Sequence, residues 1–238
     1  MSHLAESPVI ILVGPKHAGK TSVGRVLAAL LGGRFTDLDE YVELLSGKSP
    51  RSLYKEGAEV FRRVEAEALG ALLGLITDQM PNGDKVPAVI AAGGGLVDNR
   101  DALALLNGGG GCSLEKRLSD RKTVDRISAD KRFKDMGAMS DDRKPVPLLV
   151  NLEVSTATAW ARIERSAACT GELPPFINTA DPQETHRLLH ERRAAAYREI
   201  ASFTVQGEGK TPEELGREIF QAMSDSRINS IYATLISP

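Results

Sequence analysis

The sequence has few cysteines, few aromatic residues and no long hydrophobic run. Its 238 residues include only two cysteines, Cys112 and Cys169, which form neither a Cys-x-x-Cys pair nor a zinc-binding spacing. The apolar run at residues 9–13 is far shorter than the roughly 20 residues of a membrane span, and no secretory signal is recognisable. These absences exclude a disulfide scaffold and predict a cytoplasmic protein with no membrane partner.

Neither sign of charge predominates in the chain. Lys and Arg total 30 and Asp and Glu total 32, so the formal net charge is −2. General nucleic-acid binders carry a basic surplus, and we therefore expect no nucleic-acid partner. Hydrophobic residues make up 42% and charged residues 26%, which is ordinary for a soluble globular protein. We expect one domain that spans residues 1–238, because that length can bury its own core.

Strand-like and helix-like segments alternate along the chain. Apolar runs predict strands at 9–13, 86–92, 148–154 and 203–205, and a further short strand is predicted at 34–37. Helical spacing of apolar residues predicts helices at 21–31, 40–46, 52–76 and 156–168, and Thr211-Pro212 begins a last helix. Gly47 and Pro50 are expected to separate the second helix from the third. This alternation predicts an α/β fold with a parallel, doubly wound sheet.

Residues 107–147 do not fit the alternating pattern. The segment opens with four consecutive glycines, is rich in charge and has sparse apolar residues with weak periodicity. We expect an insertion here, with one short helix near residues 113–127 and a mostly solvated charged surface. The tail at residues 225–238 is expected to be loosely held.

The strongest motif is GPKHAGKT, from Gly14 to Thr21, which matches G-x-x-x-x-G-K-[ST] between a predicted strand and a predicted helix. Backbone N–H groups in such a loop, together with the positive end of the helix dipole, bind phosphate. Lys20 is expected to reach the β- and γ-phosphates, and the Thr21 hydroxyl to bind Mg²⁺. No Asn-Lys-x-Asp element is present, which favours ATP over GTP. The predicted nucleotide-binding residues of this phosphate loop are Gly14, His17, Ala18, Gly19, Lys20, Thr21 and Ser22.

Two carboxylates, Asp37 and Asp39, follow the predicted second strand. In an extended segment, alternation places both on the same side. Asp37 could then hold Mg²⁺ through water, and Asp39 could hydrogen-bond an acceptor hydroxyl and take its proton. The alternative is a solvated turn that leads into a helix cap, and the spacing alone leaves both open.

Taken in order, several segments resemble the shikimate kinase family: GPKHAGKTSVGRVLA, FTDLDEYVE, EVFRRVEAEAL, VIAAGGGLV and ADPQETHRLLHERRAAAYREIA. The resemblance covers most of the chain outside residues 107–147. It implies ATP-dependent phosphorylation of the 3-hydroxyl of shikimate, in the pathway towards chorismate and the aromatic amino acids. It also implies a three-layer P-loop kinase fold with a five-stranded parallel sheet and a mobile lid, as in nucleoside monophosphate kinases. We expect a monomer.

The resemblance also implies roles for individual residues. Asp39 would hold shikimate hydroxyls, Thr21 and Asp37 would serve Mg²⁺, and Gly93, Gly94 and Gly95 would let the sugar-like ring approach the backbone. Two arginines, Arg62 and Arg193, would bind the shikimate carboxylate, an arrangement that suits two guanidinium forks. Arg192 is an alternative to its neighbour Arg193. Lys210 would lie near the adenine.

The chain departs from the family pattern in its lid. The corresponding segment, residues 173–177, reads LPPFI and lacks the arginine that normally helps to neutralise phosphate charge. Arg165, another residue or the insertion could supply that charge. Two other functions stay open: a kinase for another small hydroxy acid or polyol with the same phosphate loop, and, because of the missing arginine, a catalytically degenerate nucleotide-binding module. His17 also stands where the family has glycine.

His186 and His190, four apart, are expected to be an ordinary helix face, because no third metal ligand is apparent.

Overall fold

The computed structural model describes residues 9–78, 86–107 and 147–224. Five strands form one parallel sheet in the order β2-β3-β1-β4-β5, which confirms the predicted α/β class. The strands are β1 (Val9–Val13), β2 (Arg34–Asp37), β3 (Ala88–Ala91), β4 (Leu148–Glu153) and β5 (Phe203–Gln206).

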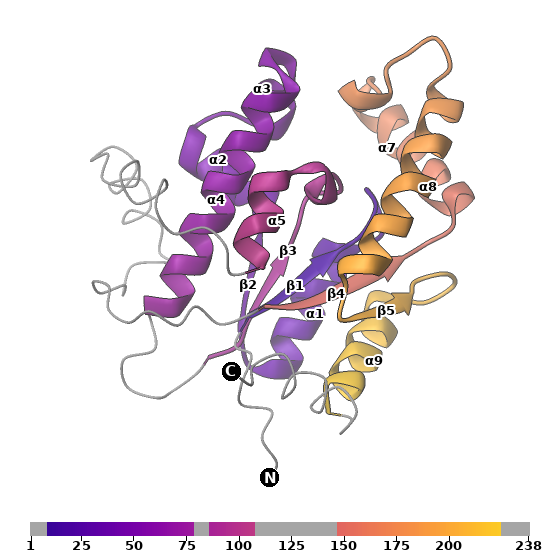
Figure 1. The fold of residues 1–238 in the computed structure, drawn as a ribbon. Coiled ribbons are helices and arrows are strands. Elements are labelled where there is room, and N and C mark those ends of the chain that lie inside the picture. The colour runs from indigo at the N-terminus through magenta and orange to yellow at the C-terminus, as the bar shows by residue number, and fades with distance from the viewer. Residues whose placement is uncertain (1–8, 79–85, 108–146, 225–238) are drawn as a thin grey trace.

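Helices cover both faces of the sheet and give the expected three layers (Figure 1). The helices are α1 (Lys20–Leu31), α2 (Leu38–Ser46), α3 (Pro50–Glu56), α4 (Ala58–Asp78), α5 (Arg100–Leu106), α7 (Thr156–Thr170), α8 (Pro182–Ile200) and α9 (Pro212–Ser224), with short 3₁₀ helices η1 (Leu96–Asp98) and η3 (Pro175–Ile177). In β1, Val9, Ile11 and Val13 pack towards α2, α4, α5 and α8, whereas Ile10 and Leu12 pack towards α1 and α9. This follows from the two-residue period of a strand, and it explains why a strand buried on both faces is apolar throughout.

The single helix predicted over residues 52–76 is wrong. The chain forms two helices here, because Gly57 adopts φ 152° and ψ 142°, which no helix accommodates and which side chains other than glycine rarely adopt. The predicted separation of the second and third helices is confirmed, because Gly47 is the C-cap of α2 and Pro50 begins α3, with Ser49 as its N-cap. The bend at Gly57 turns α3 away from α4 towards the upper end of the molecule in Figure 1.

The parallel strands deliver several loops to one edge of the sheet. In register, Asp37 of β2 lies beside Ala91 of β3, and Val13 of β1 lies beside Asn151 of β4. The phosphate loop, the start of α2 and the triplet Gly93–Gly95 therefore emerge at neighbouring carboxyl ends, where open α/β sheets bind ligands. In Figure 1, α3 and the connection between α7 and α8 stand at this same end, on either side of it.

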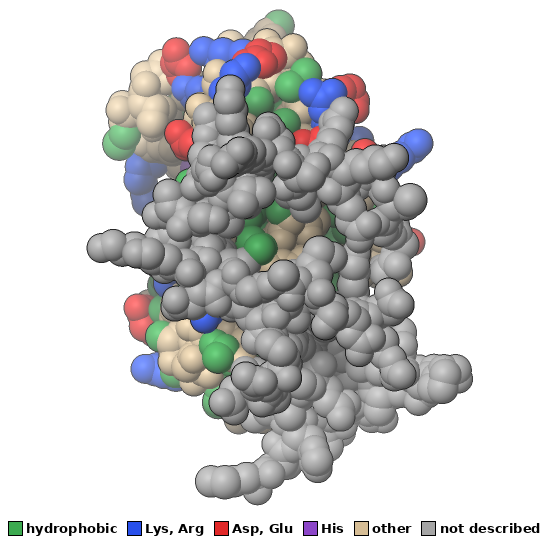
Figure 2. Space-filling model, turned by 90° about the vertical axis from the view of Figure 1, so that its left-hand side faces the viewer, with side chains coloured by type: hydrophobic (Ala, Val, Ile, Leu, Met, Phe, Trp, Pro, Cys, Tyr) green, Lys and Arg blue, Asp and Glu red, His purple; other side chains and the backbone are tan. Residues whose placement is uncertain are grey.

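Where described side chains show in Figure 2, acidic and basic groups are interspersed at the upper end of the molecule. No described helix is long and apolar enough to cross a membrane. The helix expected near residues 113–127, almost all of the insertion at 107–147 and the tail at 225–238 lie outside the described residues.

Candidate active site

Lys20 lies inside the phosphate loop as the first residue of α1. Its Nζ donates hydrogen bonds to the carbonyl oxygens of Gly14, at 2.9 Å, and Pro15, at 2.8 Å. The residue is only 8% exposed, and this burial lowers the pKa of Lys20 to about 8. The loop thus holds an ammonium group at its centre, as the sequence motif predicts for a phosphate-binding lysine.

His17 has the only positive φ outside glycine among the described residues, at 61°. This left-handed conformation carries a strain of about 1 kcal/mol for a residue with a Cβ, which explains why a glycine suits the position. Burial, reinforced by the charge of Lys16, lowers the pKa of His17 to about 4, so its ring is neutral at pH 7. The carbonyl of His17 accepts a hydrogen bond from Nη1 of Arg162 at 2.8 Å, and this bond ties α7 to the loop. The sequence analysis did not single out Arg162.

Asp37 joins the phosphate loop to α2. Its Oδ2 accepts a hydrogen bond from Oγ1 of Thr21 at 2.6 Å, and its Oδ1 accepts one from the backbone N–H of Asp39 at 3.0 Å. Asp37 is therefore the N-cap of α2, and the extended arrangement expected for residues 37–39 is wrong because the helix begins at Leu38. Hydroxyl and carboxylate oxygens are nevertheless the donors that Mg²⁺ prefers. In the described ranges, no cluster of three or more His, Cys, Asp or Glu residues could hold a metal by itself.

Asp39 and Glu65 approach Gly93 closely. A methyl group at Gly93 would lie 2.7 Å from Oε1 of Glu65 and 3.2 Å from Oδ1 of Asp39. Burial raises the pKa of Asp39, and the positive charges of Lys16 and Lys20 oppose that rise. Burial also raises the pKa of Glu65 to about 7, although a 2.9 Å hydrogen bond from Nδ2 of Asn99 works against it. The site therefore holds one buried carboxyl group, Glu65, and one half-buried carboxyl group, Asp39, near cations, a pattern common at catalytic sites.

Arg193 projects from α8 towards the same place. Asp98 fixes its guanidinium, with Oδ2 accepting hydrogen bonds from Nε at 2.9 Å and from Nη2 at 2.7 Å. The Arg193 side chain is 11% exposed and packs against Gly95 and the ring of Phe176. Its neighbour Arg192 also bonds Asp98, but the Arg192 side chain is 64% exposed and lines neither of the cavities described below. Of the two alternatives, it is Arg193 that reaches the site.

Arg62 is not drawn into the site in this structure. Its guanidinium pairs with Glu59, one turn earlier on α4, and lines neither cavity. Another arginine that the sequence analysis missed, Arg51 of α3, does line a cavity. It bonds Oε2 of Glu172 at 2.5 Å and the carbonyls of Glu172 and Leu173 at 3.3 Å. Arg51 thereby connects α3 to residues 171–178, which we call the lid segment.

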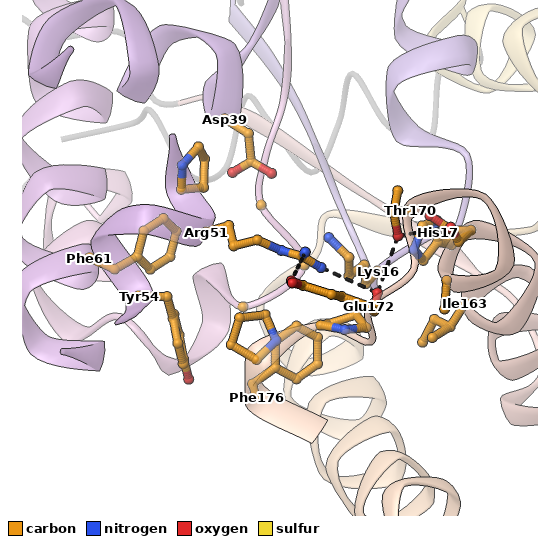
Figure 3. A pocket seen from close by; sticks show the side chains of 18 of the residues that line it. Lys16, His17, Asp39, Arg51, Tyr54, Phe61, Ile163, Thr170, Glu172 and Phe176 are labelled. Carbon is orange, nitrogen blue, oxygen red and sulfur yellow. Dashed lines mark hydrogen bonds and ion pairs between the residues drawn. The ribbon is translucent and has the colours of Figure 1, made fainter. Parts of the chain in front are cut away.

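Two cavities adjoin at this edge of the sheet. The α3 cavity, of about 310 Å³, lies between α3, the glycine triplet and the lid segment (Figure 3). The loop cavity, of about 500 Å³, follows the phosphate loop and continues to Lys210 and Pro212. Four residues line both cavities: Lys16, His17, Asp39 and Gly94.

Most of the predicted site residues are brought together by these cavities. The α3 cavity is lined by Asp39, Arg193 and all three glycines of the triplet. Residues 16–23 of the phosphate loop and the start of α1 line the loop cavity, as do Asp37 and Lys210, while Gly14 contributes its carbonyl to Lys20. A methyl group at Gly94 would lie 2.7 Å from the backbone nitrogen of Lys16, so only glycine lets the triplet and the phosphate loop touch.

Several lining residues carried too weak a pattern to be found from the sequence. Tyr54, Phe61 and Phe176 form the aromatic wall of the α3 cavity, with the ring centroids of Tyr54 and Phe61 5.9 Å apart. Phe61 and Glu65 both lie in the quoted segment EVFRRVEAEAL, which was the available signal for them. His186 and His190 are buried on one face of α8, where the ring of His186 packs against Trp160 of α7. Neither histidine lines a cavity.

Comparison of the sequence with known proteins identifies relatives of this chain. A family model described as shikimate kinase matches residues 16–144. A shikimate kinase of Salinispora arenicola is 31% identical over 90% of the chain and 96% of its own length. A shikimate kinase of Marinomonas sp. is 28% identical over 92% of the chain and 94% of its own length.

The fold has solved counterparts as well. A structure of the shikimate kinase from Acinetobacter baumannii in complex with shikimate superimposes with a TM-score of 0.63 at 25% identity, over 91% of this chain and 93% of the other. The shikimate kinase of Aquifex aeolicus gives a TM-score of 0.58 at 23% identity, which extends the similarity of fold. The matches cover nearly the full length of both chains, so they concern the whole architecture and not the phosphate loop alone.

Proposed function

The chain belongs to the shikimate kinase family, and we propose that it transfers the γ-phosphoryl group of ATP to the 3-hydroxyl of shikimate. The observation that carries this proposal is the common wall between the cavities, where Asp39, Lys16 and Gly94 border both. A triphosphate in the loop cavity and an alcohol in the α3 cavity would meet at that wall, and such positioning supplies much of the rate of a phosphoryl transfer.

On the donor side, the nucleotide occupies the loop cavity. Lys20 exchanges its carbonyl partners for phosphate oxygens, and the loop N–H groups and the start of α1 bind the remaining negative charge. Arg162, which is bound to the His17 carbonyl, and Lys210 also line this cavity, and we propose that the nucleoside extends towards Lys210. The oxygens of Thr21 and Asp37 fit Mg²⁺, which when bound with ATP neutralises phosphate charge.

On the acceptor side, shikimate occupies the α3 cavity. Arg193, held by Asp98, presents its guanidinium to the carboxylate, and the aromatic wall covers one side of the ring. Arg62 becomes the second carboxylate ligand if its side chain leaves Glu59, a weak exposed partner with 86% of its side chain accessible. Gly93–Gly95 provide bare backbone for the ring.

The chemistry is an in-line displacement at phosphorus. The acceptor oxygen forms a bond to the γ-phosphorus while the bond from that phosphorus to the β–γ bridging oxygen breaks, and ADP leaves. The proton of the acceptor hydroxyl passes to Asp39, whose raised pKa makes its carboxylate a better base than an exposed aspartate. We further propose that residues 1–238 act as one monomeric cytoplasmic domain in which residues 107–147 are inserted.

The sequence analysis left two other functions open, and the similarity to shikimate kinases favours neither of them. A kinase for another small hydroxy acid or polyol would share the phosphate loop but prefer a different acceptor. A catalytically degenerate module would bind nucleotide without transfer, a possibility raised by the absence of a lid arginine. The retention of Lys20, Thr21, Asp37 and Asp39 around connected cavities argues against the degenerate module, because a relaxed site has no reason to keep them together.

The test is ADP release by the purified protein in a coupled assay with and without shikimate. We expect shikimate to stimulate ADP formation, and we expect Lys20→Ala or Asp39→Asn to abolish the stimulation while Lys55→Ala, an exposed site on α3, leaves it intact. Stimulation by another acceptor in a substrate panel, and not by shikimate, would identify a different kinase. Nucleotide binding without transfer to any acceptor would identify the degenerate module.

A further inference from the structure

The lid segment of this chain brings no cation to the transferring phosphoryl group. Its residues 173–177 are Leu, Pro, Pro, Phe and Ile, and η3 presents the Phe176 ring to the α3 cavity. Phosphoryl transfer spreads negative charge over the equatorial oxygens of the moving group, and a cation there contributes strongly to the rate. Some other residue of the chain must therefore meet that charge, or the reaction will be slow.

Among the described residues, most cations near the cavities are already engaged. Arg51 is bound to Glu172, Arg193 to Asp98 and Lys210 to Glu218. Arg162 donates to the carbonyl of His17, and Lys20 to two loop carbonyls. Arg165, which could have replaced the lid arginine, is exposed on α7 and lines neither cavity.

Lys16 differs from all of these. It lines both cavities, it is half-buried, and within the described ranges its Nζ has no hydrogen-bonding or ion-pair partner. In the close-up of the α3 cavity, its side chain lies between Asp39 and the segment that carries Glu172 (Figure 3). Among the neighbouring cations, Lys16 has the largest effect on the Asp39 carboxyl, which places its charge close to the proposed base.

The main chain of Lys16 is also fixed in position. Its backbone nitrogen lies so close to Gly94 that even a methyl group there would approach it to 2.7 Å. The next residue, His17, is bound through its carbonyl to Arg162. The base of the Lys16 side chain is thus anchored at the common wall, and the flexible stem leaves the ammonium free to follow a ligand.

We propose that Lys16 is a catalytic residue that contacts the equatorial oxygens of the γ-phosphoryl group during transfer and supplies the positive charge that the lid segment lacks. This proposal rests on the proposed function. In the step itself, the acceptor oxygen bonds to the γ-phosphorus, the bond to the β–γ bridging oxygen breaks, and the hydroxyl proton moves to Asp39. Lys16 keeps its own proton throughout and stabilises the charge of the moving group, while Lys20 holds the β- and γ-phosphates.

The experiment compares Lys16→Met, which keeps the length of the stem and removes the charge, with Lys16→Arg, which restores the charge. We expect Lys16→Met to lower kcat about 100-fold or more, as for other single transition-state donors, with the KM for shikimate and the Kd for ATP changed less than about threefold. Lys16→Arg should recover at least one tenth of the wild-type kcat. Lys55→Met, an exposed lysine outside both cavities, serves as the matched control and should behave like wild type.

Three results would overturn the proposal. An unchanged kcat in Lys16→Met would show that the charge of Lys16 is not needed. If Arg165→Met then lowered kcat, the role would belong to Arg165. A rise in the KM for shikimate with kcat unchanged would make Lys16 a ligand of the acceptor carboxylate. If raising the pH from 6 to 9 restored the full kcat of Lys16→Met, Lys16 would act only by keeping Asp39 ionised. A wild-type protein without shikimate-dependent turnover would instead contradict the proposed function. The midpoint of urea unfolding, measured for each variant, shows whether that variant is folded.

Discussion

At the scale of single residues, Glu65 is a buried acid with one unsatisfied oxygen. Its Oε2 accepts a hydrogen bond from Asn99, whereas Oε1 has none among the described residues, and the residue is 1% exposed. A buried ionised carboxyl is unfavourable when it lacks full hydrogen bonding, so the folded protein prefers the protonated form. The charge of Glu65 near Asp39 adds repulsion between the two carboxylates.

This arrangement predicts that Glu65→Gln stabilises the protein at alkaline pH. The pKa of Glu65 is about 7 in the folded protein against 4.5 when unperturbed, so the favourable contribution of its protonated form is complete below about pH 4.5 and is lost as the pH rises through 7. Gln stays neutral, and urea unfolding at pH 8 should show a gain of about 1–3 kcal/mol over wild type. The gain should shrink towards zero at pH 4.5.

A matched control is Glu43→Gln, which changes an exposed carboxylate of α2 and should shift the unfolding free energy little at either pH. A pH-independent difference between Glu65→Gln and wild type would show that the effect comes from packing and not from ionisation.

At the scale of elements, α1 and α9 pack against each other at Gly216. A methyl group on Gly216 would lie 2.6 Å from Cγ1 of Val26, a stiff β-branched side chain on α1. Gly74 of α4 offers the opposite case, because a methyl group there would meet nothing within 4 Å. We therefore expect a change of glycine to alanine to alter the free energy of unfolding in opposite directions in these two helices.

We expect Gly216→Ala to destabilise the protein by about 1–3 kcal/mol through overpacking, and Gly74→Ala to stabilise it by up to about 1 kcal/mol because alanine favours a helix interior. Urea unfolding curves of the two variants measure both values. Equal effects in the two helices would mean that helix propensity, and not the contact between α1 and α9, decides the outcome.

The elements were largely predictable from the sequence, and the exceptions have local causes. Buried parallel strands have a nearly continuous apolar signature, so β1 was predicted to the residue at 9–13. The edge strand β2, with the sequence RFTD and no buried residue, lacks that signature, although its bounds also match the prediction at 34–37. The apolar spacing of α3 and α4 runs on through Gly57, so the break there depends on one backbone conformation that the pattern does not encode. The short helix α5 was missed because seven residues are too few for a period to show.

At the scale of the whole molecule, the site depends on contacts between segments far apart in the sequence. The phosphate loop and Asp39 could be assigned from local motifs and the family resemblance, and the structure places them at one edge of the sheet. Three other features could not be assigned in this way: the choice of Arg193 over Arg192 as the residue that lines the α3 cavity, the position of Lys16 between the two cavities, and the ion pair of Arg51 with Glu172. Each depends on how α3, α7 and α8 are arranged around that edge. Local pattern carries no information about that arrangement.

The α3 cavity is closed by α3, the glycine triplet, the lid segment and α8, so a ligand bound there connects distant parts of the chain and stabilises the fold as a whole. For a ligand that binds only the folded state, the gain is RT ln(1 + [L]/Kd), or about 2.7 kcal/mol at 100 times Kd. We expect shikimate at that concentration to raise the unfolding free energy of the wild-type protein by this amount. Arg193→Met should lose most of the gain at the same concentration, because the guanidinium of Arg193 is the proposed carboxylate ligand and its side chain is only 11% exposed. Arg192→Met, which alters the exposed neighbour on the same helix, should keep this gain in unfolding free energy.

Stabilisation by ATP should survive in both variants, since neither arginine lines the loop cavity. Loss of the shikimate effect in Arg192→Met with retention in Arg193→Met would reverse the assignment of the two arginines.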